Sequence, residues 1–211
     1  KHYWYSFVSL EQKKHPFLRD RLEAANGHII YSAALTRKDL HPWDEHQIFS
    51  KNLVPGALLI ETMIHALHME LQKPLDLVDF KIHSSIEFSS EADSVETQIL
   101  LNFENNDWFL HFYARNPQDQ LWVKIASSRG QDETTSIEEN GIAVKDMTFD
   151  NIFDKEMVKT FYRNIEDSGV RYGDAFRVVE HVQSSSNIIE AKLTTQRDIK
   201  GYLFSPGLLD G

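Results

Sequence analysis

The sequence predicts an α+β fold, in which one long buried helix is followed by an antiparallel meander. The helix is expected from about Gly56 to Leu71, because apolar residues recur there at helical spacing and Pro74 then stops it. A strand is expected before it, over His28–Leu35. The apolar positions of the helix are Leu59, Ile60, Met63, Ile64, Leu67 and Leu71.

Three strands are expected after the helix, because apolar and polar residues alternate there with a period of two. Polar turns at Asn105–Asp107 and Asn116–Asp119 separate them. Each strand is expected to present one apolar face. The first face is Val95, Thr97, Ile99, Leu101 and Phe103, the second is Trp108, Leu110 and Phe112, and the third is Leu121, Val123 and Ile125.

The chain divides into two unequal halves. Residues 1–130 hold the long helix and the meander, and residues 131–150 are polar, acidic and without an apolar period, which predicts a linker. Residues 151–211 predict a helix over Asp154–Ile165, strands over Phe176–Gln183 and Ile188–Thr195, and a helix start at Pro206. Two strands alone are marginally stable, so we expect the polypeptide to continue beyond Gly211.

The composition excludes several classes of function. The 211 residues include no cysteine, so disulfides and thiolate metal ligands are excluded, and this fits a reducing, cytoplasmic environment. The net charge of −10 argues against nucleic acid and anionic membranes as partners. No apolar run approaches the roughly 18 residues of a membrane span, and the opening residues do not lead us to expect a signal peptide.

A Pro-Gly pair opens an apolar helix start twice, and each time an ionisable residue stands beside it. Pro55 and Gly56 follow His46, which is suited to act as a general base near neutral pH. Pro206 and Gly207 precede Asp210 on the first turn of a helix, where a carboxylate interacts with the helix dipole. Amides at a helix N-terminus can hold a developing oxyanion.

Two further clusters allow both a structural and a functional interpretation. Tyr172 and Gly173 form either a glycine-hinged turn or a site where a phenol donates to a substrate and the backbone approaches closely. Glu61, His65 and His68 share one helix face at a spacing that could hold a metal, but they coincide with the expected polar stripe and lack a fourth ligand. We therefore expect no metal site, and the remaining histidines, His15 among them, to be structural or solvated.

Taken together, these clusters resemble the dehydratase domains of modular polyketide synthases, which have a double-hotdog fold. The family signatures are His-xxx-Gly-xxxx-Pro, Gly-xx-Tyr-Gly-Pro-x-Phe and a Leu-Leu-Asp preceded by Pro. This chain has His46 and Pro55, then Gly169, Tyr172, Gly173 and Phe176, then Pro206 with Leu208, Leu209 and Asp210, in that order. The opening His2-Tyr3-Trp4 and His15-Pro16 are similar to the entry of such a domain.

The resemblance implies a long central helix wrapped by antiparallel sheet, with the second hotdog incomplete in this chain. It implies a dehydratase that removes water from a β-hydroxyacyl thioester. His46 would be the base, Asp210 the acid assisted by Tyr172, and the amides near Gly56 would hold the carbonyl. No cofactor is expected beyond the phosphopantetheine of an acyl carrier protein. The expected partners are that carrier protein, neighbouring synthase domains and a second copy of the chain.

Two departures from the family pattern keep alternatives open. Ser50 stands where the family has glycine, and Asp174 stands where it has the proline after Tyr-Gly. The alternatives are a double-hotdog docking scaffold without chemistry, a dehydrating pyran-forming cyclase, and a double-bond isomerase. Isomerases of this type often lack the aspartate, so Asp210 favours dehydration. His46 and Asp210 are expected to face each other across a tunnel.

Overall fold

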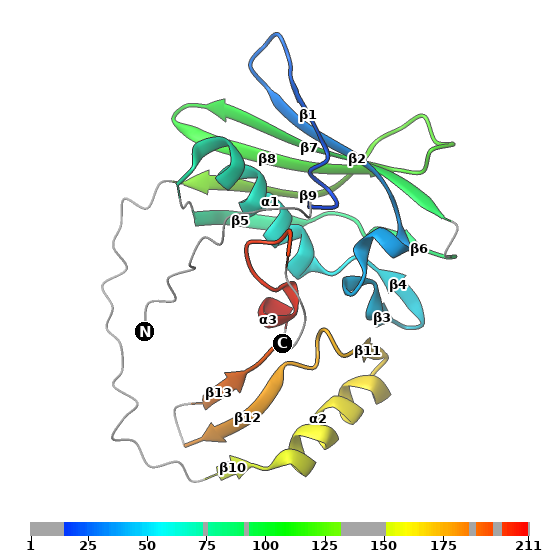
Figure 1. Cartoon of the computed structure of the whole chain (residues 1–211), viewed down its shortest axis with the longest axis vertical. Helices are drawn as coiled ribbons and strands as arrows, with labels where there is room; N and C mark the ends of the chain where they lie inside the picture. The colour runs from blue at the N-terminus through cyan, green and yellow to red at the C-terminus, as the bar shows by residue number, and fades with distance from the viewer. Residues whose placement is uncertain are drawn as a thin grey trace.

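A central helix wrapped by an antiparallel sheet forms the larger part of the computed structural model (Figure 1). The structure describes residues 15–73, 76–90, 93–131, 151–185, 189–195 and 200–210. The helix is α1 (Gly56–Leu71), as predicted. The six-stranded sheet has the order β1-β2-β7-β8-β9-β5. Its strands are β1 (Asp20–Glu23), β2 (Ile29–Thr36), β5 (Asp76–Ile82), β7 (Ser94–Glu104), β8 (Asp107–Arg115) and β9 (Val123–Gln131).

The core lies between α1 and the concave face of this sheet. On α1, Leu58, Met63 and Leu67 are fully buried, and they belong to one apolar cluster with Ile99 and Phe112 of the sheet. Burying such side chains stabilises the fold by roughly 1.5–3 kcal/mol each. The apolar face of α1 thus fixes the helix, and with it the position of its N-terminus.

The predicted meander is confirmed, with corrections at its ends. Val95, Ile99 and Leu101 are buried on one face of β7, whereas Phe103, at the end of that strand, is 54% exposed. The third predicted face is wrong, because Leu121 precedes β9 and is exposed and Val123 is half exposed. The pairing of β8 with β9 shifts register where Phe112 lies opposite Ala126 and Tyr113 opposite Lys124, so Ile125 is an extra residue in β9 and breaks the alternation of that strand.

A second, smaller sheet joins segments from both halves of the chain. It has the order β11-β3-β4-β6, with β3 (His46–Ile48), β4 (Lys51–Leu53), β6 (Glu87–Phe88) and β11 (Val170–Tyr172). Two short 3₁₀ helices, η1 (Arg37–Leu40) and η2 (Trp43–Glu45), lead into β3. Strands of two or three residues carry no periodicity, so the sequence did not predict them.

The second half contributes a three-stranded sheet and two helices. The sheet has the order β10-β12-β13, with β10 (Asn151–Phe153), β12 (Val179–Ser184) and β13 (Ile189–Leu193). Helix α2 (Lys155–Asp167) begins at the cap Asp154, whose Oδ1 accepts from the Met157 amide at 2.9 Å. Helix α3 (Pro206–Asp210) lies beside α1 (Figure 1).

One prediction for this half is corrected, and several predictions along the chain fall outside the described residues. Phe176 is not in a strand; it lies in a turn before β12 and is fully buried. The predicted linker lies, from residue 132 to 150, outside the described residues, as do Pro74, Ile188 and the His2–Trp4 entry. None of the described helices is long and apolar enough to cross a membrane.

Candidate active site

His46 begins β3 and lies in a buried aromatic pocket. Its side chain is 7% exposed, and its ring centroid lies 5.7 Å from that of Tyr172 and 5.6 Å from that of Phe176. The His46 Nδ1 lies 3.4 Å from the Leu53 carbonyl oxygen, which can only accept, so Nδ1 carries the proton in the neutral imidazole. The lone pair is therefore on Nε2, the nitrogen available to take a proton.

Tyr172 reaches His46 because β11 pairs with β3 in antiparallel register. Tyr172 lies directly opposite His46, and Val170 lies opposite Ile48. Hydrogen bonds at both ends extend this ladder: the Phe49 amide donates to the Gly169 carbonyl at 2.7 Å, and the Gly173 amide donates to the Glu45 carbonyl at 3.1 Å.

Two glycines allow this close pairing of the halves. Gly169 has φ +97°, and a Cβ there would overlap the Phe49 ring. A Cβ on Gly173 would overlap the Glu45 side chain. The predicted close backbone approach at Gly173 is therefore made to Glu45, the residue before His46. Sequence reasoning did not identify Glu45, because it belongs to none of the motifs that the sequence analysis used.

Tyr172 also lies next to Asp210. Burial, followed by the charge of Asp210 and a hydrogen bond to its carboxylate, raises the pKa of Tyr172 to about 12. The phenol is thus protonated at neutral pH and can donate. Asp210 Oδ2 is buried and has no hydrogen-bond partner in the part of the chain that the structure describes.

Helix α3 approaches this site closely because it begins with small residues. Pro206 and Gly207 are buried, and a Cβ on Gly207 would overlap the Ala175 carbonyl oxygen. Ala175 follows the Tyr172-Gly173 pair by two residues, so the contact at Gly207 brings α3 against the segment that carries Tyr172. Both Pro-Gly pairs therefore lie at helix starts, as predicted.

The N-terminus of α1 follows His46 closely in the chain. Pro55 is the N-cap, and its carbonyl accepts from the Leu58 and Leu59 amides at 3.1 and 3.3 Å. The first amides of a helix, here those of Gly56 and Ala57, have no intrahelical acceptor. Leu53, which contacts the His46 ring, lies three residues before Gly56, so the imidazole and the free amides are close in the chain.

The structure thus brings both His46 and Asp210 next to one residue, Tyr172. A lone pair on a buried imidazole, a protonated phenol and a carboxylate lie in one buried region next to a helix N-terminus. This arrangement can remove a proton from carbon and deliver one to a leaving oxygen. Sequence reasoning missed Trp43, whose ring packs 5.8 Å from that of Phe176 behind the site.

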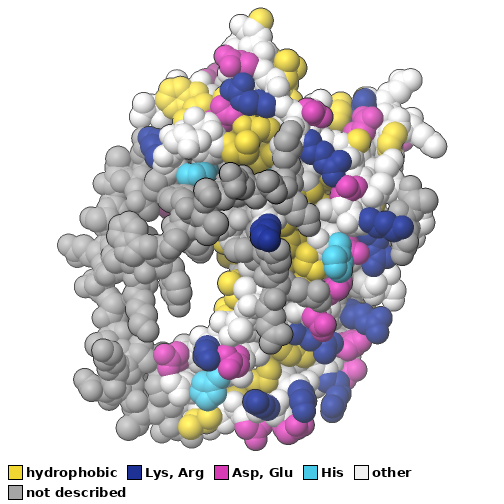
Figure 2. Space-filling view, viewed as in Figure 1, with side chains coloured by type: hydrophobic (Ala, Val, Ile, Leu, Met, Phe, Trp, Pro, Cys, Tyr) yellow, Lys and Arg dark blue, Asp and Glu magenta, His cyan; other side chains and the backbone are white. Residues whose placement is uncertain are grey.

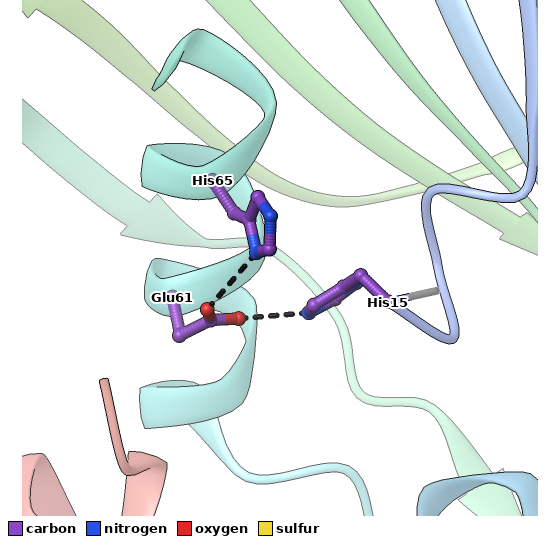
Figure 3. Close-up of side chains that lie close together, drawn as sticks. All are labelled: His15, Glu61 and His65. Carbon is purple, nitrogen blue, oxygen red and sulfur yellow. Dashed lines mark hydrogen bonds and ion pairs between the residues drawn. The ribbon is translucent and has the colours of Figure 1, made fainter. Parts of the chain in front are cut away.

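A second buried cluster contains two residues that the sequence suggested as metal ligands. Glu61 and His65 of α1 lie with His15 rather than with His68, and their candidate ligand atoms are within 4.8 Å of one another (Figure 3). The prediction of a polar stripe was wrong for Glu61 and His65, which are buried. Helical periodicity could not predict the burial of Glu61 and His65, because their partner, His15, comes from another segment of the chain.

Comparisons with known proteins agree with this architecture. A family model described as the polyketide synthase dehydratase domain matches residues 15–115, and one described as the polyketide synthase dehydratase N-terminal domain matches residues 154–211. No curated protein matches the sequence.

Solved structures share the fold at low sequence identity. The dehydratase domain from the CurF module of the curacin synthase has a TM-score of 0.79 at 17% identity, over 94% of this chain and 74% of that chain. The dehydratase domain from the terminal module of the rifamycin synthase has a TM-score of 0.78 at 20% identity, over 93% and 74%. A dehydratase structure from work on the borrelidin and fluvirucin synthases has a TM-score of 0.76 at 21% identity, over 93% and 71%.

The central helix wrapped by antiparallel sheet, with part of a second such unit beside it, defines a double-hotdog domain. The chain belongs to the polyketide synthase dehydratase family.

Proposed function

We propose that this domain removes water from a β-hydroxyacyl thioester delivered on the phosphopantetheine arm of an acyl carrier protein. The observation that carries the proposal is the position of Tyr172, which contacts the His46 ring and hydrogen-bonds Asp210. Elimination from adjacent carbons needs a base and an acid on one substrate, and Tyr172 lies next to a candidate for each.

In the proposed reaction, His46 Nε2 takes the proton from the α-carbon. The carbon–hydrogen electron pair forms the α–β double bond, and the bond from the β-carbon to oxygen breaks. For this step the proposal requires the acid form of Asp210, which gives its proton to the departing hydroxyl; the hydroxyl leaves as water, and Tyr172 donates a hydrogen bond to the same oxygen. The proton on His46 then returns to Asp210 through solvent, which restores both groups.

The free amides of Gly56 and Ala57 would stabilise negative charge on the thioester carbonyl as the α-proton leaves. Because the thioester itself acidifies the α-carbon, the reaction needs no further cofactor. Two of the similar structures support the roles of the base and the acid. They are described as inactive mutants of a curacin synthase dehydratase, one with a histidine changed to phenylalanine and one with an aspartate changed to asparagine.

Binding of the carrier protein and of a second copy of the chain stays a prediction. A basic patch would attract an acidic carrier protein, and Arg171 and Arg177 are the candidates for such a patch in this half of the chain. Both arginines instead approach Glu166, at 3.1 and 3.6 Å, and Lys and Arg side chains alternate with Asp and Glu over α2 (Figure 2). A cleft lined by Lys159, Tyr162, Arg163, Arg177 and their neighbours lies on this mixed surface.

The test is incubation of the domain with a 3-hydroxyacyl carrier protein and detection of the dehydrated acyl group by mass spectrometry. His46→Ala and Asp210→Asn should each lower turnover by about 10²–10⁴-fold, the range for a positioned acid or base. Full turnover by either variant would contradict the assigned roles. A wild-type domain that binds the substrate without releasing water would favour the scaffold alternative.

A further inference from the structure

A buried carboxylate on α1 joins three segments that are distant in the sequence (Figure 3). Glu61 is fully buried, and its Oε2 lies 2.7 Å from His15 Nε2. Its Oε1 lies 3.3 Å from His65 Nδ1 and accepts from the Leu203 amide at 2.7 Å. The Leu203 contact spans 142 residues and links α1 to the segment that leads into α3.

Hydrogen bonds fix the protonation of this cluster. The Phe17 amide donates to His15 Nδ1 at 3.3 Å, so the proton of the neutral ring is on Nε2, which donates to Glu61. Burial lowers the pKa of His15 and outweighs the opposing influence of Glu61, which keeps the ring neutral. For Glu61, burial opposes ionisation, but hydrogen bonds from His15 and His65 prevail and lower its pKa.

These donors make the cluster a hydrogen-bond network rather than a metal site. A metal at His15 Nε2 would need a lone pair on the atom that carries the proton, and Nδ1 already accepts from the Phe17 amide. The Glu61 carboxylate is an acceptor for three donors. A buried carboxylate in such a network is costly to disturb, because each donor left without an acceptor loses about 1–3 kcal/mol.

Aromatic packing also holds the segment that leads into α3. The Tyr202 ring lies 4.9 Å from the His15 ring and 5.6 Å from the Trp43 ring. Burial, and then the charge of Glu61, raises the pKa of Tyr202, so the phenol stays neutral. Leu203 follows directly, and α3 begins three residues later at Pro206.

We propose that Glu61 is a positioning residue for the acid of the active site: by holding the Leu203 amide it fixes the start of α3 and thereby sets where Asp210 stands against Tyr172. This inference rests on the proposed function for its catalytic consequence. Its structural part, the restraint of residues 203–210 by Glu61, does not depend on that function.

The experiment compares Glu61→Gln with a matched control, Thr62→Val. Glutamine keeps one oxygen but turns an NH₂ group toward a donor, so at least one of the contacts fails. Thr62 is the next residue on α1 and is fully buried, and its hydroxyl donates to the Leu58 carbonyl of its own helix at 2.7 Å. Thr62→Val therefore perturbs the same buried helix by removing a hydrogen bond within α1 and leaves the bond between Glu61 and the Leu203 amide in place.

The first readout is amide hydrogen exchange. Glu61→Gln should speed exchange over residues 203–210 by about tenfold or more, while the amides of α1 and β7 keep wild-type rates. Thr62→Val should leave exchange over residues 203–210 unchanged. Wild-type exchange over this segment in Glu61→Gln, or equal acceleration in the control, would overturn the inference.

The second readout is steady-state turnover of a 3-hydroxyacyl N-acetylcysteamine thioester. Glu61→Gln should lower kcat by about 10–100-fold with little change in KM, because a misplaced acid affects the reaction more than binding. In an Asp210→Asn background Glu61→Gln should have no further effect. A full additional loss in the double variant would show that Glu61 does not act through Asp210.

A third variant covers the case in which Glu61→Gln does not fold. Leu203→Pro removes the amide donor and leaves the carboxylate with His15 and His65, and it should reproduce the loss of kcat. Leu203→Pro with wild-type kcat would overturn the inference. If the wild-type domain turns over no thioester, the proposed function fails, and the exchange measurements still decide whether Glu61 restrains α3.

Discussion

Replacing Gly207 with alanine tests whether the packing of α3 controls the active site. The added Cβ would overlap the Ala175 carbonyl oxygen and come within 3.1 Å of its carbon and 3.5 Å of Trp43 Cζ3. The obstacle is backbone, so it cannot be relieved by a rotamer change. To restore ordinary contact, α3 must move by about 1 Å, and it carries Asp210 with it.

The magnitude follows from this displacement. Overpacking of a buried site costs about 1–3 kcal/mol of the free energy of unfolding. For a domain of this size each kcal/mol lowers the Tm by about 2–4 °C. A displacement of about 1 Å at a reacting group can lower the rate about 100-fold, so Gly207→Ala should lose far more activity than its stability loss explains.

The assay combines thermal unfolding with mass-spectrometric detection of the dehydrated thioester. Gly27→Ala is the matched control: Gly27 has φ +81° with no atom within 4 Å of the added Cβ, so this variant pays about 1–2 kcal/mol of backbone strain remote from α3. It should unfold at a lower temperature and keep its turnover. If Gly207→Ala retained both its Tm and its turnover, the reasoning from the Ala175 contact would be refuted.

Three further predictions concern local features. Tyr172→Phe should change the pH dependence of stability: the phenol stabilises the fold fully below about pH 10, and this contribution is lost as the pH rises toward 12. Urea unfolding at pH 9 and pH 11 should therefore differ less in the variant, by at most about 1.3 kcal/mol and by less in practice, because Tyr172 is partly exposed and solvent screens its charge. Asp154→Ala removes the cap of α2 and should lower stability by about 1 kcal/mol in denaturant unfolding, with turnover unchanged. Ser50→Gly should raise stability by up to about 1 kcal/mol, because Ser50 has φ +66°, and a lower Tm would contradict this.

Long periodic segments could be predicted from the sequence, and contacts between distant segments could not. Helix α1 and strand β7 have enough residues for their period to be unambiguous, and both were found where expected. Strands β3 and β11 have three residues each, and their pairing sets the register of His46 against Tyr172. No local pattern encodes such a pairing, because its stability comes from hydrogen bonds between the two halves.

Buried ionisable residues were the other source of error. Glu61 and His65 were assigned to the exposed polar face of the helix because their spacing fits such a face. The residue type alone does not show whether a glutamate is buried or exposed. What makes burial possible is a set of donors from elsewhere, here His15 and the Leu203 amide. For the candidate site, motif order selected His46, Tyr172 and Asp210 without reference to their contacts. The structure places the first and the last next to Tyr172, and their roles in a reaction stay a prediction.

The two departures from the family pattern have a conformational explanation. Ser50 is exposed, and it lies at positive φ in the turn between β3 and β4, where glycine is the residue least strained. Asp174 is also exposed, and it is the second residue of a turn closed by the Phe176 amide on the Gly173 carbonyl at 3.0 Å, a position that favours proline. The family residues at both positions therefore serve the backbone.

It follows that neither substitution removes a group that the proposed reaction uses. Serine in the left-handed region strains the β3–β4 turn, and aspartate in place of proline leaves the second turn less rigid. Both effects change stability, and neither places a side chain between His46 and Tyr172. Loss of chemistry thus cannot be argued from Ser50 or Asp174. The scaffold alternative has to be decided at His46 and Asp210, the groups that Tyr172 connects.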